Sequence, residues 1–113
     1  MSENEPLPDT TLENLPERLR EAAARAGWTS LMPVQARAIP YMLGERHMMI
    51  QARTGSGKTG AFLLPMLERL DPSRHHCQAL ILVPTHELAR QVGQEAERLC
   101  GGAGLRTVIV YGG

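Results

Sequence analysis

A single lysine lies in a glycine-rich run whose residue types suit phosphate binding. Lys58 is the only lysine among the 12 Lys+Arg residues of this 113-residue chain, and it belongs to the run Gly55-Ser56-Gly57-Lys58-Thr59. The two glycines permit positive φ, which lets successive backbone N–H groups turn toward an anion. A compact ammonium fits between phosphate oxygens, and a threonine hydroxyl is a ligand for Mg²⁺. The run therefore predicts a phosphate and magnesium site, with Lys58 and Thr59 as catalytic residues.

The wider segment 52–59 departs at one position from the phosphate-loop pattern G-x-x-x-x-G-K-[ST], because Ala52 stands where the first glycine belongs. Alanine suits that position if its backbone keeps a negative φ. An apolar stretch precedes the segment and an amphipathic stretch follows it, which is the strand, loop and helix context that the pattern requires. This context disfavours the alternative, a glycine-rich turn with a solvated lysine.

Composition limits the chain to one small globular domain or part of one. Hydrophobic residues make up 42% of the chain, and 12 acidic residues balance 12 basic ones. This balance creates no strong field for nucleic acid, so such a role requires local sites. No apolar run is long enough to cross a membrane. Cys77 and Cys100 lack a C-x-x-C spacing and no signal peptide is apparent, which favours free thiols and a cytoplasmic location.

The first third of the chain predicts a tail and two helices. Residues 1–11 are acidic and proline-containing with few apolar side chains, which predicts a mobile tail. Leucine and alanine recur at helical spacing over 16–26, and Gly27 supplies a stop. A second helix is expected from Pro33 onward, broken or restarted at Pro40.

The remainder predicts alternating strands and helices. Three short apolar runs, at 47–51, 79–83 and 107–111, have the character of buried strands. Between them, 58–70 and 87–99 are amphipathic and long enough to be crossover helices. The order β-α-β-α-β implies an α/β fold with a parallel sheet, whose ligands bind beyond the carboxyl ends of the strands. The glycine-rich loop falls at that edge of the sheet.

Three motifs together give the chain a family resemblance. They are the run at 52–59, the run Pro84-Thr85-His86-Glu87-Leu88-Ala89-Arg90-Gln91, and Gly112-Gly113. In this order and spacing the chain resembles the N-terminal portion of the first RecA-like domain of a DEAD-box RNA helicase. The resemblance implies a flexible tail at 1–11, a Q-motif-like helical region at 12–45, and an incomplete parallel-sheet P-loop NTPase (RecA-like) domain at 46–113.

The resemblance also implies roles for individual residues. Gly27-Trp28 followed by Gln35 is similar to the Q motif, which recognises adenine, and a glutamine amide can both donate and accept. Gln35 would contact the base, and Trp28 would flank it or serve only as a hydrophobic lid between the first two helices. ATP phosphates and Mg²⁺ would be held by Thr54, Gly55, Ser56, Gly57, Lys58 and Thr59. Single-stranded or short duplex RNA would be held by its backbone at Pro84, Thr85, His86, Glu87, Gly112 and Gly113.

Three departures from the family pattern carry expectations of their own. Leu31-Met32 stands where Pro-Thr is usual, so we expect less secure adenine selectivity. His86 replaces a permanently charged arginine, so we expect a weaker grip on RNA or weaker domain coupling. No clear counterpart of an upstream aromatic residue occurs near Thr10, which removes a possible stacking partner.

The 113 residues contain no Asp-Glu-Ala-Asp motif. Their only aspartates are Asp9 and Asp71, and neither closes an apolar strand. ATP hydrolysis by this family needs such a carboxylate, and it also needs an arginine from a second domain. We therefore interpret the sequence as a truncated piece of a helicase, with a strand ending in Asp-Glu expected beyond Gly113. Two other classes stay open, namely a different P-loop NTPase or DNA helicase fragment and a non-catalytic nucleotide-binding fragment.

Overall fold

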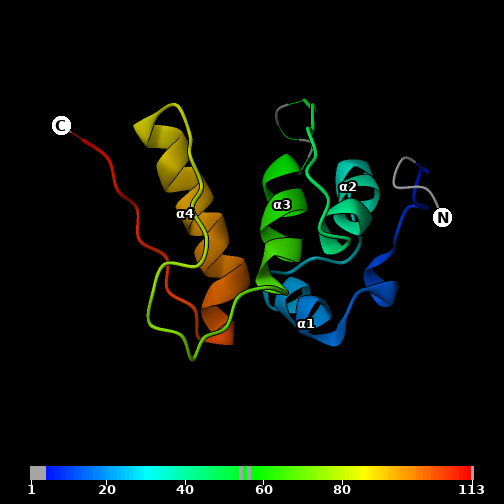
Figure 1. The fold of residues 1–113 in the computed structure, drawn as a ribbon, viewed down its shortest axis with the longest axis horizontal. Helices are drawn as coiled ribbons and strands as arrows, with labels where there is room; N and C mark the ends of the chain where they lie inside the picture. Colours follow the sequence, from blue (N-terminus) through cyan, green and yellow to red (C-terminus); the bar gives the residue numbers. More distant parts are fainter. Residues whose placement is uncertain (1–4, 54, 56, 113) are drawn as a thin grey trace.

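The computed structural model describes residues 5–53, 55 and 57–112, and these contain four α-helices. The helices are α1 (Glu17–Arg25), α2 (Pro33–Leu43), α3 (Lys58–Leu67) and α4 (His86–Cys100), with short 3₁₀ turns η1 (Leu12–Asn14) and η2 (Gly101–Ala103). Figure 1 shows α3 between α2 and α4, while α1 lies across the end of the group that is remote from the start of α3. None of the described helices is long and apolar enough to cross a membrane.

One apolar core joins all four helices. Its largest fully buried side chains come from every helix and are mostly leucines: Leu19, Ile39, Leu63, Leu64, Leu67 and Leu99. Each such side chain contributes about 1.5–3 kcal/mol when it leaves water. Ala22 and Ala23 on α1 are also fully buried, and their small side chains let α1 lie close to its neighbours. The core therefore fixes where α3 begins, and with it the glycine-rich loop.

The first predicted helix is confirmed. α1 lies within the predicted 16–26, with Pro16 at its N-cap and Ala26 at its C-cap. Gly27 follows with a φ of 83°. A residue with a Cβ rarely adopts that angle, so glycine ends the helix here and turns the chain toward Trp28.

The predicted break in the second helix is wrong. α2 continues through Pro40 to Leu43 without interruption. Proline usually breaks a helix because it leaves the carbonyl four residues earlier without a donor. Here that carbonyl belongs to Ala36, and it accepts a hydrogen bond from the Thr10 backbone N–H at 3.0 Å. A distant segment therefore supplies the donor that Pro40 removes.

The two later helices are confirmed with shifted ends. α3 begins at Lys58 as predicted but ends at Leu67, after which three backbone N–H groups bond three residues back, from Glu68, Arg69 and Leu70. This pattern is the tightening that helices show in their last turn. α4 is one residue longer at each end than the predicted 87–99.

The predicted parallel sheet is not confirmed within the described residues. Residues 47–51, 79–83 and 107–111 carry no strand assignment, and none of their backbone groups takes part in a backbone hydrogen bond between segments. A strand is defined by its pairing, so an apolar run without a neighbouring strand stays an extended segment. Its apolar side chains then face water, as for Leu80, Leu82, Val108 and Val110, which are 78–85% exposed.

The N-terminal segment lies along α2. The Leu7 N–H donates to the Tyr41 hydroxyl at 2.9 Å, and the Asp9 carboxylate lies 3.4 Å from the Arg37 guanidinium. Residues 5–10 are thus held at several points, although the sequence predicted a mobile tail. The division of the chain into three regions stays a prediction.

Candidate functional site

Both glycines of the glycine-rich loop adopt the positive φ that the sequence predicted. Gly55 and Gly57 have φ of 82° and 88°, and Gly57 is the N-cap of α3. The first N–H groups of a helix have no partner within the helix, so this loop leads into a site that favours anions. Thr54 and Ser56, which the sequence also assigns to phosphate, lie outside the described residues.

The lysine of the loop reaches back across it. Lys58 Nζ donates to the Ala52 carbonyl at 3.1 Å, and the side chain stays exposed. An ammonium makes a stronger, charge-assisted hydrogen bond with an anionic oxygen than with a neutral carbonyl. Lys58 can therefore exchange Ala52 for a phosphate oxygen without moving out of the loop. Thr59 is half-buried in the first turn of the same helix.

Gln35 joins α2 to this loop. Its side chain is 4% exposed, its Oε1 accepts from the Met32 N–H at 2.9 Å, and its Nε2 donates to the Gly57 carbonyl at 3.2 Å. The first bond closes the N-terminus of α2, as expected for glutamine at the third helical position. A glutamine amide offers two donors and two acceptor lone pairs. One donor and one acceptor position therefore remain for a ligand.

The side chains of Met32 and Trp28 pack closely against the glycines at the start of α3. A Cβ added at Gly57 would lie 2.6 Å from Met32 Sδ, and a Cβ added at Gly60 would lie 2.7 Å from the Trp28 ring. Trp28 also packs against the hydrophobic core. It therefore lies between the core and the first turn of α3, and the choice between flanking adenine and serving only as a lid stays a prediction.

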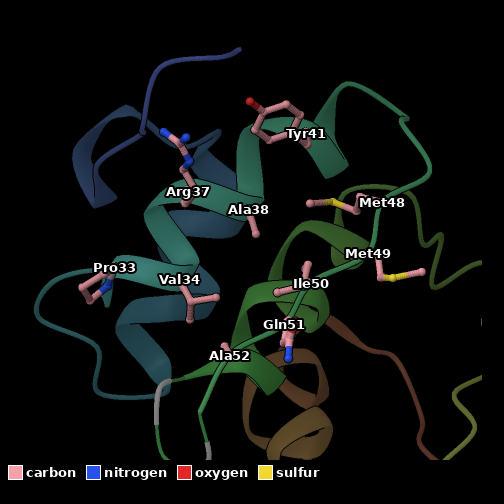
Figure 2. Close-up of a pocket in the computed structure, with 10 residues that line it drawn as sticks. All are labelled: Pro33, Val34, Arg37, Ala38, Tyr41, Met48, Met49, Ile50, Gln51 and Ala52. Carbon is pink, nitrogen blue, oxygen red and sulfur yellow. The ribbon is translucent and has the colours of Figure 1, made fainter. Parts of the chain in front are cut away.

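An open groove lies beside the loop. Figure 2 shows it between α2 and the extended segment 48–52, with Val34, Ala38 and Ile50 facing it from the two sides. It is open to solvent, has a volume of about 410 Å³, and has apolar walls apart from a few polar groups such as Arg37 and Gln51. The Met49 side chain points away from it and is 99% exposed. Because the groove lacks convergent polar groups, it is a weaker candidate for nucleotide than the loop.

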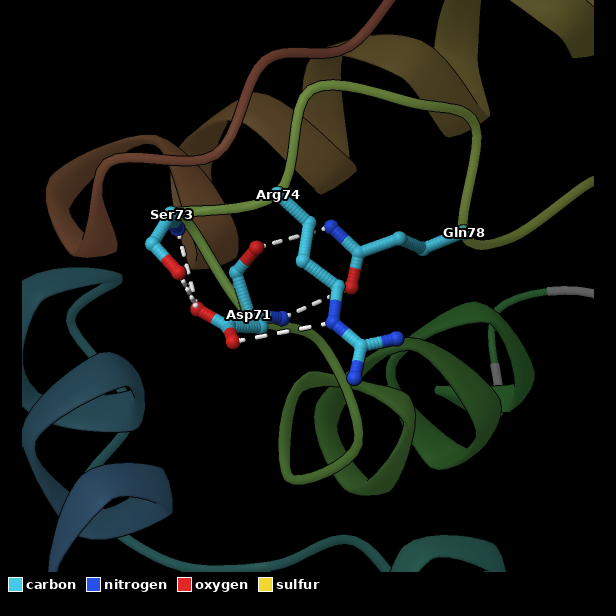
Figure 3. Close-up of polar contacts among 4 residues, drawn as sticks. All are labelled: Asp71, Ser73, Arg74 and Gln78. Carbon is cyan, nitrogen blue, oxygen red and sulfur yellow. Dashed lines mark hydrogen bonds and ion pairs between the residues drawn. The ribbon is translucent and has the colours of Figure 1, made fainter.

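Among the described residues, no group of three or more metal-ligating side chains occurs, and the two aspartates are engaged away from the loop. Asp9 pairs with Arg37, and Asp71 lies in the turn after α3. Figure 3 shows the Asp71 carboxylate accepting bonds from the Ser73 N–H and hydroxyl at 2.9 and 2.7 Å, with Arg74 at 3.8 Å. These contacts, chiefly the Ser73 hydroxyl, lower the pKa of Asp71. The two glycines at positive φ and the exposed Lys58 at the start of α3 thus suit an anion such as phosphate, and the role of Thr59 toward Mg²⁺ stays a prediction.

The residues predicted to contact RNA gather at the start of α4. Thr85 is the N-cap, and its Oγ1 accepts from the Leu88 N–H at 3.1 Å, which leaves the hydroxyl hydrogen free to donate. The rings of His86 and Tyr111 pack with centroids 4.5 Å apart and planes inclined by 35°. This contact brings the segment that ends at Gly112 beside the start of the helix.

A second contact anchors that segment. A Cβ added at Gly93 would lie 2.4 Å from Ile109 Cδ1, so glycine allows the C-terminal segment to lie directly on α4. Pro84, Glu87 and Gly112 are exposed beside the ring pair, and Gly113 lies outside the described residues. The starts of α3 and α4 point toward the same edge of the molecule in Figure 1.

Comparison with known proteins places this arrangement in a family. The DEAD/DEAH box helicase family profile matches residues 32–113. The chain belongs to the DEAD/DEAH box helicase family. Over 100 residues it is 43% identical to "ATP-dependent RNA helicase DeaD" of Haemophilus influenzae, a match that covers 88% of this chain and 16% of that protein. It is 42% identical over 99 residues to "DEAD-box ATP-dependent RNA helicase RhpA" of Helicobacter pylori, with coverages of 88% and 20%.

Solved helicase structures share the backbone arrangement. The RNA helicase Prp28 from Chaetomium thermophilum bound to ADP matches with a TM-score of 0.80 and 38% identity, covering 96% of this chain and 28% of that one. A DEAD box protein from Methanococcus jannaschii matches with a TM-score of 0.72 and 36% identity, with coverages of 88% and 28%. The chain therefore spans less than a third of the helicases that it resembles.

Two residues of this helicase site were not identified by sequence reasoning. Met32 was expected only to remove a hydroxyl, yet its sulfur packs on Gly57. Thr10 was considered only as a missing aromatic, yet its N–H completes α2. For Thr10 the available signal was Pro40, because a proline inside a helix leaves one carbonyl without a donor from the helix itself, and that carbonyl then needs a donor from another segment.

Proposed function

We propose that this chain is the ATP-binding portion of a DEAD-box RNA helicase that couples ATP binding and hydrolysis to RNA duplex unwinding or remodelling of RNA–protein complexes. The observation that supports this best is the start of α3, where two glycines at positive φ, Lys58 and Gln35 meet. We further propose that residues 46–113 are part of a RecA-like domain, preceded by a Q-motif-like region at 12–45. Its sheet would include 47–51, 79–83 and 107–111.

The nucleotide would be held from two sides. Backbone N–H groups at Gly55, Gly57 and the first turn of α3, together with the Lys58 ammonium, would bind the phosphates. The free donor and acceptor positions of Gln35 would pair with N7 and the exocyclic amine of adenine. Gln35 would pair with adenine while its Nε2 keeps the hydrogen bond to the Gly57 carbonyl. Base recognition and loop position would thus depend on one side chain.

Magnesium would enter with the nucleotide. Mg²⁺ neutralises charge on the phosphates when it is bound with ATP. Within this chain the Thr59 hydroxyl would contact it, and Lys58 would hold the neighbouring phosphate oxygens. Neither aspartate of the chain is placed to be the acidic partner that this chemistry needs, since Asp9 pairs with Arg37 and Asp71 with Ser73.

RNA would lie over the start of α4. The Thr85 hydroxyl, the N–H groups of the first helical turn and the glycine backbone at 112–113 would bind phosphates without reading sequence. Pro84, His86 and Glu87 would border the same path. A neutral chain can bind RNA through such a local surface even though it has no net positive charge.

Calorimetry with Mg-ADP and Mg-ATP tests the nucleotide site on a sample shown to be folded by circular dichroism. We expect saturable binding of both and weaker binding of Mg-GDP, because guanine presents a carbonyl where adenine presents an amine. If a folded sample gives no heat of binding with any of the three nucleotides, the proposed nucleotide site is wrong.

A second candidate is a chain that binds nucleotide but does not hydrolyse it by itself. The missing acidic strand end favours this for the 113 residues, because a phosphate site without its carboxylate lacks most stabilisation of the transition state. Phosphate-release assays should then give negligible turnover. Turnover comparable to that of an intact helicase would contradict it, and DNA-dependent turnover would favour another P-loop enzyme.

A further inference from the structure

The backbone N–H of Thr10 occupies an unusual place. Pro40 cannot donate to the Ala36 carbonyl, and Thr10 N–H does so instead at 3.0 Å. Ala36 is half-buried under the N-terminal segment. An acceptor that loses its partner in such a position is costly, so this bond is a required part of α2 and not an incidental contact.

Other contacts hold the same segment, residues 5–10, in register. The Leu7 N–H donates to Tyr41 Oη at 2.9 Å, and the Arg46 guanidinium donates to the Glu5 carbonyl at 3.4 Å while it lies 5.4 Å from the centre of the Tyr41 ring. Prolines alternate through the segment at positions 6 and 8. They hold it extended and restrict it before binding, so less conformational entropy is lost when it docks.

The position of this bond matters for the nucleotide site. Ala36 directly follows Gln35, and Gln35 holds the Gly57 carbonyl at 3.2 Å from the first turn of α2. A shift of the α2 backbone at Ala36 would therefore move the glutamine amide relative to the loop. Displacements of about 1 Å are enough to lose oriented hydrogen bonds.

We propose that the N-terminal segment 5–10 is a strap that positions Gln35, and that the Thr10 N–H is its essential contact. The inference rests on the proposed nucleotide site. The inference extends that proposal by assigning adenine selectivity in part to a backbone group outside α2. The strap acts through Gln35 and contacts neither nucleotide nor RNA itself.

Thr10→Pro in the complete protein that carries this sequence is the direct test, because it deletes the N–H. It also fixes φ at residue 10 and restricts Asp9, so the rescue described below is needed to assign its effect to the lost hydrogen bond. Thr10→Ala retains the N–H and is the matched control. We expect Thr10→Pro to weaken Mg-ADP binding about threefold to tenfold and to reduce the preference for Mg-ADP over Mg-GDP, as loss of one oriented hydrogen bond does. Thr10→Ala should bind both nucleotides as the wild type does.

Pro40→Ala supplies a rescue. It restores the N–H that α2 lacks, so the Ala36 carbonyl gains a partner within the helix and the Thr10 bond becomes redundant. The double variant Thr10→Pro/Pro40→Ala should therefore recover both affinity and selectivity. Failure of this rescue, or unchanged selectivity in Thr10→Pro, would overturn the strap even if affinity falls.

Hydrogen exchange adds a test that the wild type alone can decide. The Thr10 amide should be protected in the wild type, and the amides of 35–37 should exchange faster in Thr10→Pro. If Thr10→Pro does not fold, an unprotected Thr10 amide in the wild type would still reject the proposal. If the wild type binds no nucleotide while the amide is protected, the proposed function fails and the strap remains only a structural contact, which also refutes its positioning role.

Discussion

The starts of α3 and α4 are two versions of one arrangement, an extended segment that turns into a helix. At α3 the turn is enclosed on one side, because Gln35 is 4% exposed and both Met32 and Trp28 contact the glycines, while Gly55 and Lys58 stay exposed. At α4 the turn is open, because Pro84, Thr85, His86 and Glu87 are all exposed, with the Tyr111 ring packed on His86.

The difference indicates what each end can hold. An enclosed turn with a buried amide fits a small ligand that is recognised from several directions. An open turn with a hydroxyl, helix N–H groups and a flat ring pair fits a polymer that passes over it. Four sets of substitutions test this comparison, and they are taken from the largest expected effect to the smallest.

Removing the single lysine should have the largest effect. Lys58→Ala deletes the charged donor of the enclosed turn, so we expect Mg-ADP affinity to fall about a hundredfold, equivalent to about 3 kcal/mol. Lys58→Arg should restore little of it, because a planar guanidinium does not fit where a compact ammonium does. Titration with a fluorescent nucleotide measures both. RNA binding at α4 should be unchanged, and equal nucleotide binding by all three proteins would contradict the assignment of the loop.

The two loop glycines form a matched pair for the next effect. Gly55 and Gly57 have nearly equal positive φ, but a Cβ at Gly55 meets no atom within 4 Å while a Cβ at Gly57 meets Gln35 Nε2 at 2.8 Å. Gly55→Ala and Gly57→Ala should each cost about 1–2 kcal/mol of stability from the left-handed backbone. Gly57→Ala should weaken nucleotide binding about tenfold more than Gly55→Ala, because its Cβ also displaces the side chains of Met32 and Gln35. Thermal melts and nucleotide titration separate the two costs, and an equal loss of binding in both variants would mean that Gln35 is not involved.

The helices and the loop glycines were predictable because their signals are local. Leucine and alanine periodicity specified α1, and Gly27 marked its end. Gly55 and Gly57 adopt the positive φ that no other residue type takes as easily. The enclosure of Gln35 was predictable only in part, since its bond to the Met32 N–H is local while its bond to Gly57 spans 22 residues.

The expectations that failed or stayed unconfirmed depend on distant partners. Apolar runs such as 79–83 report burial, but a strand also needs a neighbour, and the described residues offer none to it. Pro40 predicted a break, and the outcome was reversed by a donor from Thr10, 30 positions earlier in the sequence. Sequence patterns identify a carbonyl that needs a donor or an apolar run that needs a neighbouring strand. Whether that partner is present depends on the fold.

The open turn is tested by restoring an arginine. His86→Arg adds a permanent cation beside Thr85, so we expect about threefold tighter binding of single-stranded RNA at moderate salt. The slope of log affinity against log salt should steepen by about 0.7, the value for one added phosphate contact. His75→Arg makes the same change in an exposed loop elsewhere and is the control. If both variants gain equally, the effect is one of net charge and α4 is not the RNA site.

The smallest expected effect concerns the turn after α3, which is remote from both sites. The Gln78 side chain closes this turn by bonding the Asp71 N–H and carbonyl, both at 2.8 Å (Figure 3). The Ser73 hydroxyl and N–H lower the pKa of the Asp71 carboxyl, with a smaller contribution from Arg74. A group whose pKa is depressed on folding stabilises the fold above its unfolded pKa, and this stabilisation is lost as the pH falls through the folded value.

Wild type and Asp71→Asn should therefore differ slightly in melting temperature at pH 7. The difference should begin to shrink below about pH 4, near the unfolded pKa, and should vanish only when the pH is below the lowered folded pKa, where the carboxylate of the wild type is protonated. In a Ser73→Ala background the difference at pH 7 should shrink, because the main cause of the lowered pKa is gone. Nucleotide and RNA affinities should stay at their wild-type values in all of these variants. A change in either affinity would mean that the turn at Asp71 is coupled to the start of α3 or α4. Binding at the enclosed and the open site would then also depend on this turn.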